Sequence, residues 1–266
     1  MNGRLIKDNK MWGYGLNSLY PDIFCFSTTR HGGVSQGDYA SMNVNPWTGD
    51  EPEHVKENQR LLLEELPAQP SLWVMPHQTH STNVKVIRES VGNGLITPED
   101  TDAVVTHLPN TLLTISTADC IPVLLYDRVT GAIAAIHAGW RGTVNHIVTQ
   151  TLQVMQREYG TQGKNLTACI GPGISLDAFE VGDEVYEAFR AADFPMERMA
   201  ERRTKWHLDL WEANRLQLLE YGVPATQIEV AGICTYTRHE EFFSARRAGI
   251  HSGRICTGIL RIENRE

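Results

Sequence analysis

The sequence predicts an α/β fold in which a mixed β-sheet and flanking helices form a sandwich. Short apolar segments bounded by glycine, proline and asparagine alternate with segments whose apolar residues recur at helical spacing. The alternation is irregular, and a mixed sheet with helices on its faces accommodates both hairpins and helical crossovers. Because no repeat, low-complexity tract or linker divides the chain, residues 1–266 are expected to form a single domain, with residues 1–15 as a peripheral N-terminal segment.

The expected strands are short apolar runs separated by turn residues. The runs at 112–116, 121–126 and 132–137 are the richest in apolar residues, as central strands should be. A glycine-containing turn at 29–35 follows the first strand. The predicted strands are residues 22–28, 72–75, 83–88, 103–106, 112–116, 121–126, 132–137, 166–170, 228–231, 242–244 and 255–262.

Four helices are predicted from apolar periodicity and end signals. The first begins near Pro52, because proline has a helical φ and lacks an N–H that the first turn does not need. The second begins at Thr143 and ends at Gly160, since glycine tolerates the left-handed conformation that closes a helix. The other two span residues 183–191 and 210–221. The apolar face of the second helix comprises Val144, Ile147, Val148, Leu152 and Met155.

The overall charge argues against a nucleic-acid partner. The chain has 24 Lys and Arg against 32 Asp and Glu, a formal net charge of −8. Nonspecific binding to a polyanion depends mainly on Lys and Arg that neutralise phosphates. A local basic cluster could still hold one small phosphate group, so a small phosphorylated ligand remains open.

Targeting signals and cysteine usage predict a cytoplasmic protein without a membrane partner. Residues 1–15 contain Lys7, Asp8 and Lys10 and no apolar run, unlike a signal peptide. No segment contains the roughly 20 apolar residues that a membrane helix needs. The five cysteines are widely spaced and form no CxxC pair, so reduced thiols are expected.

The residues best suited to catalysis flank one predicted hairpin. Its two apolar strands are joined by residues 127–131, which have turn chemistry. If Tyr126 pairs with Gly131, the same register places Cys120 opposite His137, with Cβ atoms about 5 Å apart. The thiol and the imidazole could then share a metal ion or form a thiolate–imidazole pair. A buried structural thiol is the alternative.

A second concentration of imidazoles could complete a metal site. His77 and His80 lie three residues apart in a turn between predicted strands. One cysteine and two histidines would provide three ligands and leave a fourth zinc position for water or substrate, as catalytic sites require. If both histidines bound, the site would have four protein ligands, as structural zinc sites do.

Several established catalytic patterns are absent from the sequence. The combination of His-x-Glu with Pro-Cys-x-x-Cys that is typical of zinc deaminases does not occur. His239-Glu240-Glu241 lacks the second histidine of a metalloprotease helix, and neither a Walker A motif nor a dinucleotide fingerprint is present. No His-x-His occurs, which argues against a multicopper oxidase with a trinuclear copper cluster.

Arginines beside the special turns are the best candidates for an anion site. Arg30 precedes a Gly-Gly pair, Arg141 follows His137, and Arg246 follows an apolar Phe-Phe-Ser run. Guanidinium groups bind phosphate bidentately, and glycine turns expose backbone N–H groups. The residues alone do not indicate which of the three binds phosphate.

A series of motifs, taken together, resembles the bacterial YfiH/YlmD family. Its members are also called purine nucleoside phosphorylase-like proteins, polyphenol oxidases or peptidoglycan editing factors, and human FAMIN is a relative. The motifs occur in the family's order over nearly the whole chain. They are Thr28-Thr29-Arg30-His31-Gly32-Gly33-Val34-Ser35, Ser41-Met42-Asn43-Val44, Gln78-Thr79-His80-Ser81, Asp102-Ala103-Val104-Val105-Thr106, Ala118-Asp119-Cys120, His137-Ala138-Gly139-Trp140-Arg141-Gly142, Ile170-Gly171-Pro172, Phe179-Glu180-Val181-Gly182 and Phe242-Phe243-Ser244-Ala245-Arg246-Arg247.

The resemblance implies a fold and a set of site residues. The implied fold is an α/β sandwich with a mixed sheet, distantly similar to the deamidase domain of cytotoxic necrotising factor toxins. The implied metal ligands are His80, Cys120 and His137, with His80 preferred because the family's histidine follows Gln-x. These three are also the expected catalytic residues. The expected substrate- or phosphate-binding residues are Arg30, Asn43, Arg141 and Arg246.

The resemblance also implies an activity on small molecules, with no nucleic-acid or membrane partner and an open oligomeric state. The leading expectation is a zinc-dependent purine nucleoside enzyme that phosphorolyses adenosine, inosine and methylthioadenosine and deaminates adenosine to inosine. The first alternative is a copper-dependent polyphenol oxidase, or laccase, because thiolate and imidazole also suit copper. The second is a hydrolase in peptidoglycan precursor editing, with Cys120 as nucleophile and His137 as base.

Overall fold

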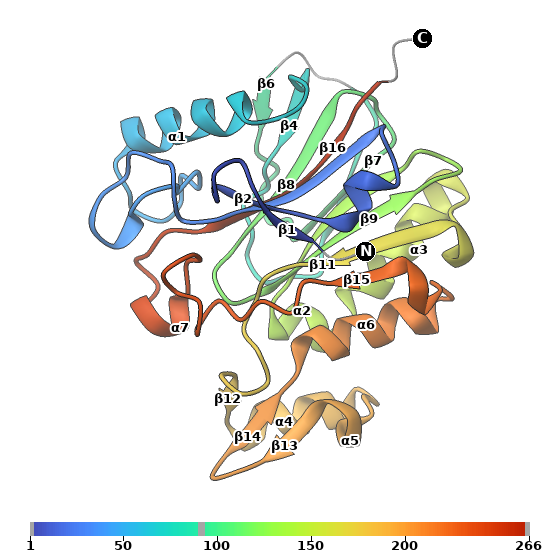
Figure 1. The fold of residues 1–266 in the computed structure, drawn as a ribbon. Helices are drawn as coiled ribbons and strands as arrows, with labels where there is room; N and C mark the ends of the chain where they lie inside the picture. Colours follow the sequence, from blue (N-terminus) through green and yellow to red (C-terminus); the bar gives the residue numbers. More distant parts are fainter. Residues whose placement is uncertain (1–2, 90–93, 264–266) are drawn as a thin grey trace.

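Two mixed β-sheets packed face to face form the centre of the molecule in the computed structural model, which describes residues 3–89 and 94–263 (Figure 1). Antiparallel pairs predominate, and parallel pairs occur near the sheet edges. The first sheet, in spatial order, is β1 (Arg4–Ile6), β2 (Met11–Gly13), β3 (Ile23–Thr28), β16 (Ile255–Arg261), β8 (Thr111–Thr117), β4 (Leu72–Val74) and β6 (Gly94–Ile96). The second is β15 (Ile228–Val230), β11 (Leu166–Ile170), β9 (Ile121–Asp127), β10 (Ile133–Ala138), β7 (Ala103–Thr106) and β5 (Val84–Ile87).

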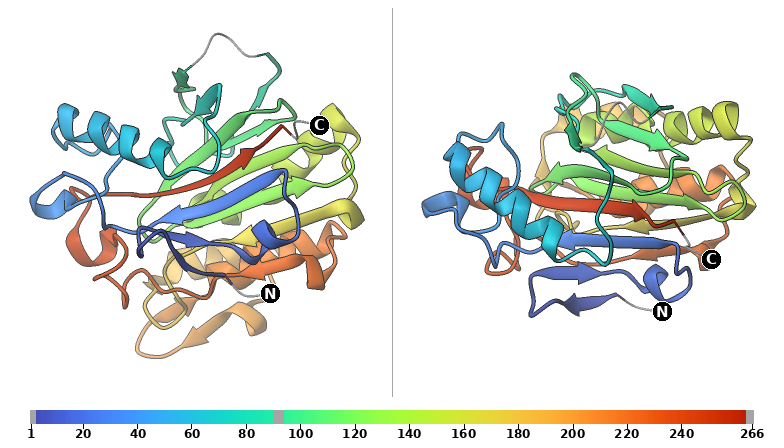
Figure 2. Two further views of the ribbon diagram at one scale, coloured as in Figure 1. Left: turned by 45° about the horizontal axis from the view of Figure 1, so that its top comes forward. Right: turned by 90° about the horizontal axis from the view of Figure 1, so that it is seen from above.

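Helices cover the outer face of each sheet (Figure 2). Leu62 of α1 (Pro52–Glu64) packs against the first sheet, and α3 (Ile147–Tyr159) and α6 (Leu210–Glu220) pack against the second. The shorter helices are α2 (Trp140–Val144), α4 (Asp183–Ala191), α5 (Met196–Met199) and α7 (Ala245–Ala248). The 3₁₀ turns are η1 (Gly15–Ser18), η2 (Gly37–Tyr39), η3 (Gly163–Asn165) and η4 (Ala225–Gln227).

The core between the sheets explains why the central strands are apolar throughout. Leu113 of β8 and Ile259 of β16 pack there against Leu124 of β9 and Ile133 of β10. Alternate residues of the same strands, such as Val123, face the helices instead. Strands buried on both faces lack the polar alternation of a solvent-facing sheet.

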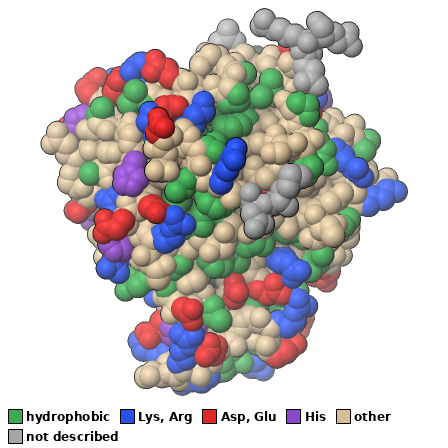
Figure 3. All heavy atoms as spheres, viewed as in Figure 1, with side chains coloured by type: hydrophobic (Ala, Val, Ile, Leu, Met, Phe, Trp, Pro, Cys, Tyr) green, Lys and Arg blue, Asp and Glu red, His purple; other side chains and the backbone are tan. Residues whose placement is uncertain are grey.

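A small three-stranded sheet belongs to a lobe at the bottom of Figure 1, formed by β12 (Glu180–Val181), β14 (Trp206–Leu208) and β13 (Ala200–Arg202) together with α4 and α5. Figure 3 shows positive and negative side chains intermixed on this lobe. The charges form ion pairs, among them Arg202–Asp183 at 2.7 Å and Lys205–Glu180 at 2.7 Å. Exposed pairs of this kind contribute little to stability.

The expected mixed α/β architecture is confirmed, with one difference in how the strands are grouped. The sequence predicted one mixed sheet, whereas the strands divide between two large sheets and one small one. Strand pairing depends on contacts between residues far apart in the chain, which local patterns do not specify. Within the predicted N-terminal segment, the described residues 3–15 supply β1 and β2 at the edge of the first sheet, where Met11 is fully buried.

Two local predictions are wrong. Residues 242–244 form no strand. The apolar run that suggested one instead places Phe242 and Phe243 in a small core with Ile233. The long helix begins at Ile147 instead of Thr143, because His146 adopts a left-handed conformation with φ of 57° and separates it from α2.

Among the described residues, no helix combines the length and the apolar character needed to cross a membrane.

The position of Leu113 in the core between the sheets yields a stability prediction. Leu113→Ala should lower the free energy of unfolding by about 2 to 5 kcal/mol, because it leaves a cavity where the sheets meet. Val129→Ala is the control: this side chain is 69% exposed in a turn, and the change should be within about 0.5 kcal/mol. Urea unfolding of both variants provides the measurement, and equal losses would contradict the assigned core.

Candidate metal centre

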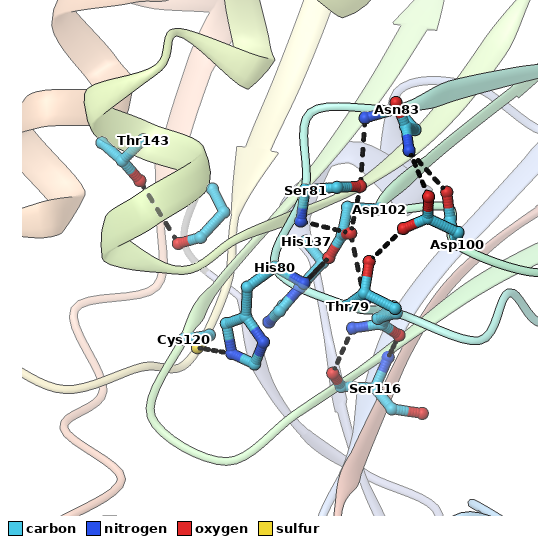
Figure 4. A network of polar contacts seen from close by, with 12 residues as sticks. Thr79, His80, Ser81, Asn83, Asp100, Asp102, Ser116, Cys120, His137 and Thr143 are labelled. Atoms are coloured by element: carbon cyan, nitrogen blue, oxygen red, sulfur yellow. Dashed lines mark hydrogen bonds and ion pairs between the residues drawn. The ribbon is translucent and has the colours of Figure 1, made fainter.

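The candidate site includes two of the places where the chain passes from the first sheet to the second. One crossing joins β4 to β5 and carries His80; the other joins β8 to β9 and carries Cys120. His137 is the penultimate residue of β10, at the same end of the sandwich. Figure 4 shows the three side chains converging from these separate segments.

The donor atoms of the three side chains fit a single metal ion. The ligand atoms of His80, Cys120 and His137 all lie within 4.8 Å of one another. Cys120 Sγ is 3.8 Å from His80 Nε2. Two ligands of a tetrahedral zinc ion, at its usual Zn–S and Zn–N distances, lie about 3.6 Å apart. Thiolate and imidazole are also the donor types that zinc and copper prefer.

The predicted hairpin register is wrong by two residues. Tyr126 pairs with Ile133 instead of Gly131, and His137 therefore lies opposite Pro122. The turn is longer because Asp127 accepts hydrogen bonds from the backbone of Val129, Thr130 and Gly131. A shift of two residues keeps each side chain on its original face of the sheet. Cys120 and His137 consequently still meet, from diagonal positions.

His80 is held by an unusual backbone conformation and by a glycine beside it. Its φ is 63°, in the left-handed region that few residues other than glycine adopt. The neighbouring Gly139 leaves room for the ring: a Cβ atom at this position would lie 2.9 Å from His80 Cδ2 and 3.1 Å from Cys120 Sγ. A side chain at residue 139 would therefore displace two of the three candidate ligands.

The buried Asp102 carboxylate connects two of the candidate ligands. Its Oδ1 accepts hydrogen bonds from His137 Nδ1 at 2.7 Å and from the His80 backbone N–H at 3.1 Å. Its Oδ2 accepts from the backbone N–H groups of Thr79 and Ser81 and from the Ser81 hydroxyl. Burial opposes ionisation of Asp102, but these bonds outweigh it and lower its pKa to about 2.

These contacts determine which nitrogen of His137 faces the centre and favour the thiolate form of Cys120. Because His137 Nδ1 faces Asp102, Nε2 is the nitrogen that faces the centre, as in carboxylate–histidine–metal arrangements. Burial would raise the pKa of the Cys120 thiol, but the His137 and His80 imidazoles outweigh it and lower that pKa. Burial would lower the pKa of His137, but Cys120 and Asp102 together raise it. The thiolate, which is the form that binds metal, is thus favoured.

The three side chains open into a cavity of about 350 Å³. This volume falls within the range of roughly 300 to 1,000 Å³ that small-molecule sites occupy. His80 is exposed, Cys120 is half-buried and His137 is buried. The described lining residues are Asn45, Trp47, Thr48, His77, Gln78, His80, Ser116, Thr117, Ala118, Cys120, His137, Ala245, Ile250 and Arg254.

His77 is not among the ligand-bearing residues that cluster in the described part of the chain. Its Nδ1 lies 2.6 Å from Glu99 Oε2, and its ring stacks on Trp47 with 4.7 Å between ring centroids. The described residues therefore provide three donors instead of the four of a structural zinc site.

None of the three arginines singled out in the sequence is among the described residues that line the cavity. Arg30 donates hydrogen bonds to the Ala40 and His239 carbonyls and thereby joins two loops. Arg141 is exposed on α2. Arg246 donates through Nη1 to the carbonyl of Glu180 in the lobe.

Asn43 is buried behind the cavity wall instead of lining it. Its amide donates to Thr48 Oγ1 at 3.0 Å and to Asp50 Oδ2 at 2.9 Å, and its Oδ1 accepts from the Arg254 backbone N–H. Asn43 therefore positions Thr48 and Arg254, which do line the cavity. Asp119, beside Cys120, accepts hydrogen bonds from the Arg246 backbone and the Thr235 hydroxyl.

Two residues that the structure places at the site, Asp102 and Arg254, were not among the candidates predicted from the sequence. Asp102 had a detectable signal, because a carboxylate directly before a short apolar strand is unusual. Arg254 had none, since no spacing rule connects it with a site formed by residues 80–137. Arg254 is recognised only from contacts between distant segments, and such contacts also reveal the hydrogen bonds of Asp102.

The fold and the site define a class: mixed α/β sandwich proteins with a His–Cys–His candidate metal centre in a cavity of small-molecule size. Within this class, the chain belongs to the YfiH/YlmD family. Residues 24–262 match the family model described as multi-copper polyphenol oxidoreductase laccase.

Two relatives and one solved structure illustrate the similarity. A Bacteroides thetaiotaomicron protein named purine nucleoside phosphorylase is 52% identical, over 96% of this chain and 98% of the relative. A protein from an unknown prokaryotic organism, named adenosine deaminase RL5, is 40% identical, over 90% and 94% of the two chains. The crystal structure of YlmD from Geobacillus stearothermophilus matches with a TM-score of 0.90 at 30% identity, over 97% and 98%.

Asp102→Asn tests the role of the buried carboxylate. An amide has one acceptor atom and would direct N–H groups toward donors, so zinc affinity should fall about 10- to 100-fold. The free energy of unfolding should fall by about 3 to 5 kcal/mol, because a buried paired network is broken. Competition with a chelator measures affinity. Asp193→Asn, at an exposed carboxylate in the turn after α4, is the control, and an equal effect there would contradict the assignment.

Gly139→Ala tests the close packing at the cluster. The added methyl group would press on both His80 and Cys120, so zinc affinity should fall about tenfold or more. Gly142→Ala is the matched control on the adjoining helix, where a Cβ meets its nearest neighbours at 3.4 Å. The same chelator competition applies, and unchanged affinity in Gly139→Ala would show that the cluster does not bind the metal.

Proposed function

We propose that this protein is a metal-dependent purine nucleoside enzyme that phosphorolyses adenosine, inosine and methylthioadenosine and deaminates adenosine to inosine. The observation that carries the proposal is the His80–Cys120–His137 cluster, which opens into a cavity large enough for a nucleoside. The relatives named purine nucleoside phosphorylase and adenosine deaminase support the substrate class.

In this proposal His80, Cys120 and His137 hold a zinc ion, and a fourth position remains for water or substrate. When bound, zinc would supply Lewis acidity and lower the pKa of water in that position. Asp102 fixes the His137 ring through Nδ1 and the His80 backbone through its N–H, so the donors are oriented before metal binds.

Trp47 offers a surface for the purine base. Trp47 lines the cavity and is 37% exposed, and its ring stacks on His77. Ile250, another lining residue, is 72% exposed. Planar apolar ligands bind well to such aromatic and aliphatic side chains. We therefore assign base binding to Trp47 and Ile250.

Two other activities have a specific observation in their favour. The thiolate–imidazole donor set suits copper, and the matching family model carries a laccase description, which together favour a polyphenol oxidase. The lowered pKa of Cys120 beside His137 favours a hydrolase, with Cys120 as nucleophile, that acts in peptidoglycan precursor editing. An oxidase requires added copper and consumes dioxygen with phenols; a hydrolase remains active without metal.

We place this activity in the cytoplasm, in a single domain spanning residues 1–266 that acts on small molecules without a nucleic-acid or membrane partner. The net charge of −8 and the five free cysteines support this assignment.

Cys→Ser variants test the proposal. Cys120→Ser should lose most of its bound zinc and both nucleoside activities, because a serine hydroxyl is a poor zinc ligand at neutral pH. Cys234→Ser is the control: this thiol is also half-buried but lies against Ser175, outside the cluster. Elemental analysis and product analysis with adenosine or inosine, with and without phosphate, provide the readouts.

Ribose 1-phosphate should form only when phosphate is supplied, whereas deamination of adenosine should continue without it. Metal-replete protein that leaves both nucleosides unchanged but oxidises phenols would replace this proposal with the oxidase. Activity in metal-free protein, abolished by alkylation of Cys120, would replace it with the hydrolase.

A further inference from the structure

We propose that Arg254, Ser116 and Thr117 form an oxyanion subsite in the metal cavity and that inorganic phosphate binds there. This inference rests on the proposed phosphorolysis, which requires phosphate beside the nucleoside. The three residues lie far apart in the sequence but line one cavity together with His80, Cys120 and His137.

Arg254 is the only lysine or arginine among the described residues that line the cavity. Its guanidinium is oriented by the preceding turn, since Nη2 donates to the Ile250 carbonyl at 2.8 Å and Nη1 to the Gly253 carbonyl at 3.1 Å. Among the described residues, no carboxylate forms an ion pair with it and no acceptor receives its Nε–H. A half-buried cation without a counter-ion favours binding of an anion.

Ser116 and Thr117 contribute two buried hydroxyl groups without partners. The two residues are 6% and 1% exposed, and neither hydroxyl has a hydrogen-bond partner within the described chain. Ser116, labelled in Figure 4, is held by Gln78: its backbone N–H donates to Gln78 Oε1 at 2.7 Å, and its carbonyl accepts from Gln78 Nε2 at 2.8 Å. The backbone of Ser116 is thus satisfied by Gln78, whereas its buried hydroxyl has no partner among the described residues. Buried hydroxyls without partners are unfavourable.

The chemistry of this group matches phosphate. Arginine provides N–H donors in a planar fork that fits phosphate oxygens, and each hydroxyl can donate one further bond. No aspartate or glutamate is among the described residues lining the cavity, so no carboxylate there repels a dianion. Burial lowers the pKa of Arg254, which bound phosphate would offset.

The position beside the metal cluster suits the proposed reaction. An oxygen of hydrogen phosphate forms the bond to ribose C1′ while the bond from C1′ to the purine nitrogen breaks. The electron pair of the broken bond leaves with the base, and the phosphate proton is transferred to the base. The products are ribose 1-phosphate and the free purine, so atoms and charge balance.

The experiment measures phosphate binding directly, by isothermal titration of zinc-loaded protein with inorganic phosphate, and separately the KM values for phosphate and inosine. Arg254→Met should weaken phosphate binding about tenfold or more, since bonds from a charged donor are lost. Its KM for phosphate should rise much more than its KM for inosine. Arg247→Met is the control. Arg247 lies on α7 and is not among the described lining residues, so this variant should bind phosphate as tightly as the wild-type protein.

Ser116→Ala and Thr117→Val keep the test informative if Arg254→Met disturbs the 250–253 turn. Each removes a hydroxyl that has no partner within the described chain, so thermal stability should be unchanged or higher. Phosphate affinity should nevertheless fall about tenfold or more, as loss of one hydrogen bond to a charged group predicts. A purely structural role would lower stability and leave phosphate affinity unchanged, which would overturn the subsite.

The outcomes separate this inference from the proposed function. Phosphate binding that depends on Arg254 but yields no nucleoside cleavage would support the subsite and reject phosphorolysis. Phosphate-dependent cleavage that is unaffected in all three variants would reject the subsite and retain phosphorolysis. Wild-type protein that binds no phosphate would overturn the subsite. Competition by adenosine 5′-monophosphate alone, without binding of free phosphate, would also overturn it in favour of a phosphate-ester site.

Discussion

The Asp102 carboxylate orders the candidate site, because it accepts hydrogen bonds from two of the three segments that meet there. It orients the His137 ring through one oxygen and holds the backbone around His80 through both. A carboxylate can be buried at this depth only when every oxygen lone pair that faces the protein has a donor. The same bonds that make Asp102 tolerable in the interior therefore fix the positions of the imidazoles.

The sandwich supplies the second constraint. Two sheets packed face to face bury nearly continuous apolar strands, so polar chemistry is confined to the ends where the chain leaves one sheet for the other. Both crossings, β4 to β5 and β8 to β9, occur at the same end and bring His80 to Cys120. Gly139 is required there because the two side chains occupy the space that a Cβ would fill.

The cavity combines groups of different chemistry within a small volume. Soft donors lie on the side of His80, Cys120 and His137, an aromatic surface is provided by Trp47, and a cation is provided by Arg254. The His–Cys–His donors suit a metal ion, the Trp47 ring suits a planar base, and the Arg254 guanidinium suits an oxyanion. Their coexistence in one cavity is the physical reason for favouring purine nucleoside chemistry over activities that need the thiol alone.

The sequence by itself determined the α/β class, most strands, the helix ends at Pro52 and Gly160, and the Cys120–His137 neighbourhood, because these follow from local periodicity, turn chemistry and motif order. The predicted proximity of Cys120 and His137 rested on an incorrect hairpin register. It nevertheless holds, because a shift of two residues leaves each side chain on the same face of the sheet. The division into two sheets, the role of Asp102 and the place of Arg254 in the cavity were decided by the tertiary structure. Each depends on contacts between segments far apart in the chain, which no local pattern encodes.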